Sequence, residues 1–138
     1  MHVPPQNVQI KRIYDPPEPT DGRRILVDRL WPRGVSKSRA AIDEWAKEVS
    51  PSPELRKWFK DHPERFETFR KRYIEELLMI PEKSKEIARL RRLAAEEKLT
   101  LLYAKKNPDC NHALVLAEVI RGTVDMESPS AEGPLSLL

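Results

Sequence analysis

Two short apolar segments that do not alternate with polar residues constrain the fold of this chain most strongly. They are residues 25–27 and 99–104, and the stretches between them carry apolar residues every three or four positions, as on one face of a helix. A strand without alternation is typical of a central parallel strand, which is buried on both faces. Strands separated by helical stretches indicate an α/β layer domain.

The periodicity predicts three strands and five helices. The strands are residues 8–14, which alternate as in a half-buried strand, and the two apolar strands 24–30 and 99–104. The helices are 38–49, 52–60, 61–80, 82–97 and 111–122, several of them marked by caps such as Ser52-Pro53 and Gly122. Together they predict a three-layer α/β domain, with a small, mostly parallel sheet flanked by helices. The connection from 14 to 24 is short for a parallel crossover, so the direction of the first strand stays open.

The chain of 138 residues has the length of one domain. We expect that domain to span residues 8–122, after a flexible segment at 1–7 and before an acidic, flexible tail at 123–138. All 25 Lys and Arg residues precede the tail, which carries Asp125, Glu127 and Glu132. The folded part is therefore more basic than the formal net charge of +3 indicates.

Composition also predicts where the protein works. No apolar run approaches the roughly 18 residues of a membrane-spanning helix, and the single Cys110 has no partner for an intramolecular disulfide. We therefore predict a soluble, cytoplasmic protein without membrane contact. Abundant Lys, Arg and Glu, 13 prolines and few amides are typical of heat-adapted proteins, which predicts thermostability.

The loop after the second strand carries the strongest candidate site. It places Arg29, Trp31, Arg33, Gly34 and Lys37 at the end of a buried strand. Guanidinium groups match phosphate and carboxylate, and glycine allows close approach to the backbone. Ligands of open α/β sheets bind beyond the carboxyl ends of the strands, so we expect a small anionic ligand here. The alternative is that the tryptophan belongs to the core and the cations are solvated or paired.

Asp28 precedes this loop and has two interpretations. Its carboxylate either orients Arg29 or acts as a general base whose pKa burial raises. Orientation is the preferred role, because the sequence supplies no second carboxylate for two-acid hydrolysis. Asp28 is nevertheless kept as a catalytic candidate.

The loop after the third strand is the second candidate. Cys110 stands where the last helix begins, so the helix terminus would lower the pKa of its thiol, and Lys105, Lys106 and His112 would lower it further. A thiolate facing an anion site is typical of transfer enzymes, whereas an inert cysteine at a helix start is the other interpretation. We count Cys110 and His112 as catalytic candidates and Tyr103, Lys105 and Asn111 as ligand contacts.

No metal or cofactor is predicted. Cys110 and His112 supply at most two of the roughly four ligands that zinc requires, and glycine-rich phosphate loops are missing from the sequence. The expected partner is a small anion bearing phosphate or carboxylate. Two alternatives remain: a non-catalytic module that binds nucleic acid or protein, and a thiol-dependent transfer enzyme using Cys110. Whether the protein is an enzyme, and its oligomeric state, stay open.

Several segments resemble one family closely. The run Asp-Arg-Leu-Trp-Pro-Arg-Gly at 28–34, with 54–59 and Asn-His-Ala at 111–113, resembles the YeaO-like family, domain of unknown function 488. Longer relatives resemble three-layer α/β domains with Asp-Val-Arg after one strand and Cys-His-Arg after another. By that likeness Asp28 and Arg29 match the first motif. Cys110 matches the second in its cysteine alone, since Asn111 follows it and His112 comes one place late. The family is uncharacterised, so the resemblance implies no activity.

Overall fold

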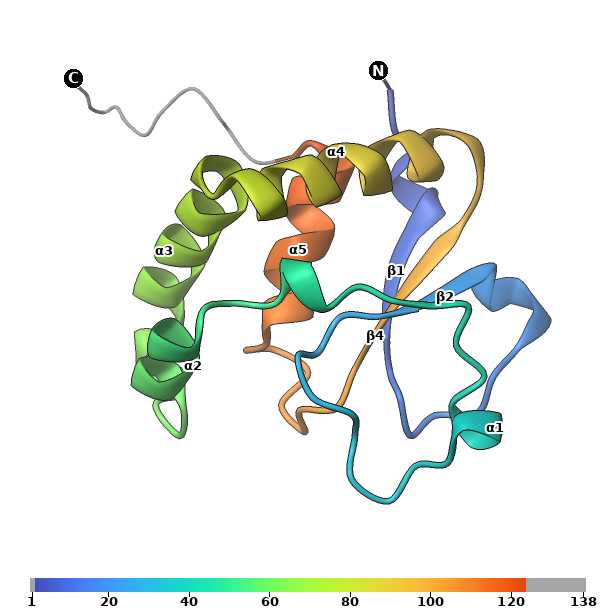
Figure 1. Ribbon diagram of the computed structural model, residues 1–138, viewed down its shortest axis with the longest axis horizontal. Coiled ribbons are helices and arrows are strands. Elements are labelled where there is room, and N and C mark those ends of the chain that lie inside the picture. The colour runs from blue at the N-terminus through green and yellow to red at the C-terminus, as the bar shows by residue number, and fades with distance from the viewer. Residues whose placement is uncertain (1, 124–138) are drawn as a thin grey trace.

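The computed structural model of the protein describes residues 2–123 and contains a four-stranded parallel sheet (Figure 1). The strands lie in the order β1 (Val8–Arg12), β4 (Leu99–Tyr103), β2 (Arg23–Leu26) and β3 (Glu44–Trp45). The two apolar strands β2 and β4 lie side by side in the interior, as predicted. The first strand is parallel to β4, with Val8 opposite Leu99. The sheet and helices confirm an α/β fold.

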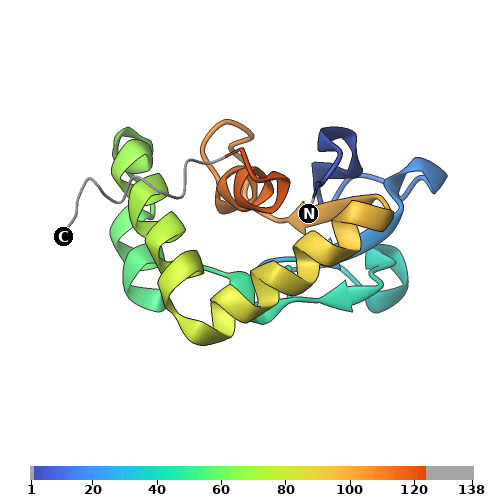
Figure 2. The same cartoon turned by 90° about the horizontal axis from the view of Figure 1, so that it is seen from above.

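Within the described residues, five α-helices and four short 3-10 turns surround the sheet. The helices are α1 (Lys37–Ala40), α2 (Pro53–Phe59), α3 (Phe66–Met79), α4 (Pro81–Glu96) and α5 (His112–Arg121). The 3-10 turns are η1 (Pro5–Asn7), η2 (Pro19–Asp21), η3 (Lys47–Val49) and η4 (Pro63–Arg65). In Figure 2, α3 lies at one end of the molecule, α4 runs from it toward the strands, and α5 lies between α3 and the strands.

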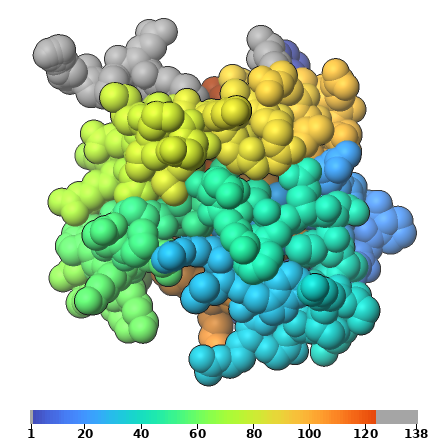
Figure 3. Space-filling model, viewed as in Figure 1, coloured from blue at the N-terminus to red at the C-terminus, as the bar shows by residue number. Residues whose placement is uncertain are grey.

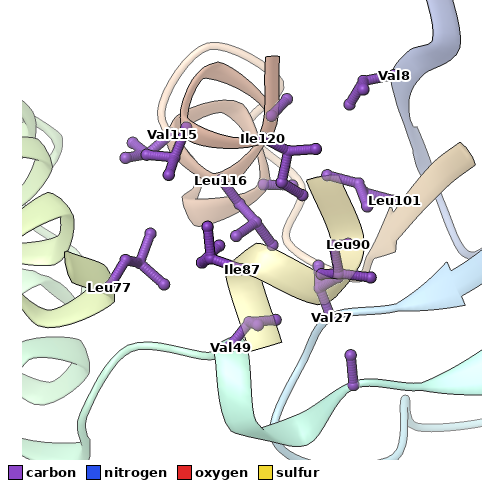
Figure 4. Close-up of a cluster of buried hydrophobic side chains, with 14 of the residues drawn as sticks. Val8, Val27, Val49, Leu77, Ile87, Leu90, Leu101, Val115, Leu116 and Ile120 are labelled. Carbon is purple, nitrogen blue, oxygen red and sulfur yellow. The ribbon is translucent and has the colours of Figure 1, made fainter. Parts of the chain in front are cut away.

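Alternation along the strands divides the core in two. Ile25 and Leu101 point toward α4 and α5, where they join the main cluster shown in Figure 4. Leu26 and Leu102 point to the opposite face, which α1 and the loops on either side of it cover. Both faces of the two central strands are therefore buried, which explains why their sequences lack alternation. Two long helices, α4 and α5, cover one face of the sheet, whereas the other face is covered by the short helix α1 and loops.

The short connection between β1 and β2 is held by Asp21. Its carboxylate lies 2.5 Å from the Arg24 guanidinium and 3.0 Å from the Lys11 amine, and its carbonyl oxygen accepts a hydrogen bond from Thr100. Asp21, Arg24 and Thr100 are all buried. β4 lies between β1 and β2, so residues 13–22 must cross one face of the sheet to connect them. This connection contains the 3-10 turn η2 but no α-helix.

The helix predicted for residues 38–49 is wrong. α1 ends after a single turn because Ala41 adopts the left-handed conformation, with φ of 49°. The buried Arg24 side chain accounts for this ending, since it donates hydrogen bonds to the carbonyl oxygens of Ala40 and Ala41. Trp45 then joins β3 opposite Leu26. The four apolar residues that suggested one helical face, Ile42, Trp45, Ala46 and Val49, are divided between the two clusters.

The structure describes the segment before the predicted domain but only the first residue of the predicted tail. In the segment expected to be flexible, Val3 is buried in the main cluster and the Asn7 amide donates a hydrogen bond of 2.8 Å to the carbonyl of Ala94. At the other end Gly122 closes α5 with φ of 79°, as its position in the sequence predicted. The acidic tail beyond residue 123 lies outside the described residues.

Candidate functional site: a basic cleft at the strand ends

A cleft opens beyond the carboxyl ends of β2 and β4, where two cavities of about 570 and 200 Å³ share four lining residues. The shared residues are Pro51, Arg56, Lys105 and His112. In Figure 3 the loop after β4, in orange, is visible between α2, in green, and the loop after β2, in blue. This is the edge of the sheet where ligands of α/β proteins bind.

Asp28 joins three elements at the base of the cleft. One carboxylate oxygen, Oδ2, accepts a hydrogen bond of 3.0 Å from the amide of Ala104 and so ties the end of β2 to the end of β4. The other, Oδ1, is buried without a hydrogen-bond partner among the described residues and lies 3.2 Å from Nε2 of His112, the first residue of α5. Asp28 therefore lies against His112, whose ring hydrogen-bonds to the carbonyl of Val27. It makes no ion pair with Arg29 in the part of the chain that the structure describes.

His112 lines both cavities with one ring nitrogen already engaged. Nε2 lies 3.2 Å from the carbonyl oxygen of Val27 and 3.2 Å from the carboxylate of Asp28. Both neighbours are acceptors, so the proton belongs on Nε2 and Nδ1 is the nitrogen left for other partners. The ring also meets Tyr73 edge-on, with centroids 6.3 Å apart. Burial raises the pKa of Tyr73 well above its ordinary value, so its hydroxyl stays protonated and donates to the carbonyl of Val49.

Three cations line the smaller cavity without a carboxylate partner: Arg29, Arg56 and Lys105. Among residues 2–123 they make no ion pair, whereas Arg23, Arg24, Arg70 and Arg89 each pair with an acidic side chain. Nε of Arg56 is buried and has no hydrogen-bond partner within residues 2–123. A desolvated guanidinium nitrogen without an acceptor is costly, which marks this position as one that an anion would stabilise.

Lys105 stands against the aromatic wall of the larger cavity. Its Nζ lies 4.0 Å from the ring centroid of Phe59, and the opposite side of that ring stacks on Phe69. Burial lowers the pKa of Lys105, with smaller opposing contributions from Cys110 and Asp61. The cleft therefore combines an apolar wall with a set of cations.

α2 is held across the cleft by its first turn. Ser52 caps the helix by accepting a hydrogen bond from the amide of Leu55, and both its amide and its hydroxyl donate to the carboxylate of Glu76 on α3. This double contact fixes the orientation of α2 and, with it, the position of Arg56. Sequence reasoning missed Arg56, because no local pattern shows which helix lies opposite the strand ends.

The structure brings together only part of the loop that the sequence singled out. Trp31 caps the smaller core cluster, with Nε1 donating to the carbonyl of Val35 and its ring 5.4 Å from that of Trp45. Gly34, with φ of 77°, lines a separate cavity of about 390 Å³ beside Tyr14. Arg33 and Lys37 are exposed and line neither the cleft nor that cavity.

The remaining predicted residues lie behind the cleft. Tyr103 is buried in the main core, and burial raises the pKa of its hydroxyl. Asn111 is also buried and caps α5, since its Oδ1 accepts a hydrogen bond of 3.0 Å from the amide of Leu114. Cys110 is partly buried and packs against the main core. Asp28, Arg29, Lys105 and His112 are thus the predicted residues that share the cleft.

Two further findings concern metals and membranes. Residues 2–123 hold no group of three or more His, Cys, Asp or Glu side chains arranged to bind a metal ion. None of the described helices is long and apolar enough to cross a membrane. The molecule is thus, in the region described, an α/β domain with a basic cleft at the carboxyl edge of its sheet.

Comparison with known proteins places this domain in a family. Residues 7–136 match the model of the inactive DUF488-N3 subclade, and the chain belongs to this family. Uncharacterized protein YeaO of Escherichia coli is 52% identical over 115 residues, which cover 83% of this chain and 97% of the relative. Uncharacterized proteins Rv3073c of Mycobacterium tuberculosis and Mb3100c of Mycobacterium bovis are each 41% identical, covering 83% of this chain and 94% of theirs. No solved structure matches. The resemblance to the YeaO-like family is confirmed.

Proposed function

We propose that this protein binds a small anion, bearing phosphate or carboxylate, in the cleft at the carboxyl ends of β2 and β4. The observation that carries the proposal is the gathering of three cations, Arg29, Arg56 and Lys105, around one cavity that a single carboxylate also lines; none of the three makes an ion pair among the described residues. Arg56 also has a buried Nε without a hydrogen-bond partner among the described residues, so its guanidinium is not committed to another protein group there. An anion held by three cations would form charge-assisted hydrogen bonds, the stronger kind in proteins.

Binding without turnover fits the site better than catalysis. The matching family model is described as an inactive subclade. One oxygen of the Asp28 carboxylate accepts a hydrogen bond from the amide of Ala104 and the other is buried beside His112, which favours a structural role for this group. Cys110 is absent from the lining of both cavities of the cleft. A thiol-dependent transfer reaction would require that sulfur to reach the anion.

Titration calorimetry with inorganic phosphate tests the proposal. Arg56→Gln should weaken phosphate binding about tenfold, the value of one charge-assisted hydrogen bond of about 1.5 kcal/mol. Arg92→Gln removes the same charge from an exposed position on α4 and should leave the affinity within about twofold. If Arg33→Gln weakens binding as much as Arg56→Gln does, the anion binds at the exposed loop, and the cleft is not the site.

The basic edge also supports a rival function, a module that binds nucleic acid. The cleft argues against it, because its cations line cavities instead of forming an open ridge. Oligonucleotide affinity that falls steeply with salt and is unaffected by Arg56→Gln would favour this rival. Phosphate binding that depends on Arg56, with weak oligonucleotide binding at physiological salt, would support the small-anion site. We place either activity in the cytoplasm.

A further inference from the structure

Lys105 lies where the two cavities of the cleft meet, and its amine is set against an aromatic ring. Among the described residues its side chain makes no ion pair, and Nζ lies 4.0 Å from the ring centroid of Phe59. Burial lowers the pKa of the amine, and the charges of Cys110 and Asp61 oppose this shift without reversing it. Lys105 is exposed, and its lowered pKa means that the amine is unprotonated more often than that of a fully solvated lysine, which favours nucleophilic attack.

A lowered pKa alone does not make a nucleophile, as Lys83 shows. Burial lowers the pKa of this lysine too, but its Nζ donates hydrogen bonds to the carbonyl oxygens of Glu48 and Ser50. Lys83 also lines neither cavity of the cleft. Lys105 differs because it lines both cavities of the cleft, and the smaller of them is also lined by Arg29 and Arg56, two cations that would hold an anionic group there.

We propose that Lys105 binds small 2-oxo acids as a reversible imine, with Arg29 and Arg56 holding the carboxylate. The inference deepens the proposed anion site and depends on it. A 2-oxo acid places its carbonyl carbon directly beside its carboxylate, so a carboxylate bound by the two guanidinium groups would leave the carbonyl carbon facing the amine. The apolar wall formed by Pro51 and Phe59 would accept the short carbon chain.

The chemistry needs no additional reagent. The nitrogen lone pair of Lys105 attacks the carbonyl carbon, a C–N bond forms, and the former carbonyl oxygen takes up a proton to give a carbinolamine. The nitrogen loses a proton and the carbinolamine then expels water, which leaves a C=N bond. No atom changes oxidation state overall, and addition of water reverses the reaction. His112 lines the same two cavities and can carry the proton between these steps.

The imine can be trapped by reduction. The full chain is incubated with pyruvate and sodium cyanoborohydride, and peptide mapping by mass spectrometry locates N-(1-carboxyethyl)lysine. Methyl pyruvate carries the same ketone without the carboxylate charge and serves as the matched reagent. Lys105→Arg keeps the positive charge but removes the nucleophile, whereas Lys106→Arg alters the exposed neighbouring lysine. Circular dichroism verifies that each variant is folded.

We expect pyruvate to modify Lys105 at least tenfold more than Lys106, and inorganic phosphate to suppress the reaction. Labelling at position 105 should vanish in Lys105→Arg and persist in Lys106→Arg. In Arg56→Gln, labelling of Lys105 by pyruvate should fall, whereas labelling by methyl pyruvate should not. If phosphate binds in the cleft yet pyruvate labels all exposed lysines evenly, the imine proposal is wrong and the anion site stands. If phosphate fails to bind and Arg56→Gln changes nothing, both proposals are wrong.

Discussion

The carboxylate of Asp28 lies 3.2 Å from Nε2 of His112 and thereby joins the end of β2 to the start of α5. The same carboxylate accepts a hydrogen bond from the amide of Ala104 at the end of β4. A single side chain therefore contacts three of the elements that surround the smaller cavity. Asp28 therefore belongs to the framework of the cleft. Mutating it should change stability, whereas mutating a residue that contacts the anion should change anion affinity.

Asp28→Asn is expected to lower the free energy of unfolding by about 1–2 kcal/mol, because an amide replaces the charged acceptor of the Ala104 amide. Phosphate affinity should not fall, since the change removes a negative charge from the cleft. Urea unfolding and phosphate titration measure the two quantities. Asp61→Asn is the matched control: Asp61 also lines the cleft, is exposed, and adopts φ of 62°, which asparagine tolerates. Equal destabilisation of both variants would contradict the framework role.

Arg56→Gln is expected to weaken anion binding without weakening the fold. In the absence of an anion, Nε of Arg56 is a buried donor without a partner among residues 2–123, so replacing the guanidinium should raise the free energy of unfolding by about 1 kcal/mol. Unfolding in urea with and without phosphate measures this. Phosphate should stabilise the wild type more than the variant, because ligand binding to the folded state adds stability. A large loss of stability without phosphate would show that Arg56 has a structural role.

The sequence allowed the central sheet to be predicted, because burial on both faces removes alternation from residues 25–27 and 99–104. It failed at residues 38–49, because an i, i+3, i+4 pattern also arises when a chain turns at Ala41 and passes from one face of the sheet to the other. The residues of the cleft likewise divide into those that the sequence pattern predicts and those that it does not. Asp28 and Lys105 could be predicted from the strand ends, whereas Arg56 depends on the contact between Ser52 and Glu76, which no local pattern encodes.

Glu44 is the centre of a surface ion-pair network that bears on the predicted thermostability. Its carboxylate lies 2.6 Å from Arg89 and 3.7 Å from Arg23, which also pairs with Glu97. Glu44→Gln should lower the free energy of unfolding by about 0.5–1 kcal/mol, a modest value because these side chains are partly solvated. Thermal unfolding measures the change, which 1 M salt should reduce. Glu75→Gln, at an exposed position of α3, should change the melting temperature little. Equal effects of the two variants would contradict a role for the network.

Asp21 is expected to control acid stability. Burial alone would raise the pKa of its carboxyl, but hydrogen bonds from the Glu18 amide, Lys11 and Arg24 outweigh burial and hold the pKa below the ordinary value of 3.8. Because the folded-state pKa lies below that of the unfolded chain, the carboxylate stabilises the fold fully above about pH 4. This contribution decreases as the pH falls through the folded-state pKa.

Asp21→Asn should therefore cost about 3–5 kcal/mol at pH 7, because it leaves the buried guanidinium of Arg24 without its counter-charge. The difference between wild type and variant should shrink as the pH falls below about 4, because the wild-type carboxyl becomes protonated. Urea unfolding at pH 7, 4 and 3 measures this convergence. Asp15→Asn, at an exposed carboxyl nearby, should cost less than about 0.5 kcal/mol at pH 7. A difference for Asp21→Asn that stays constant over this pH range would show that its carboxylate is not the group that couples folding to acid.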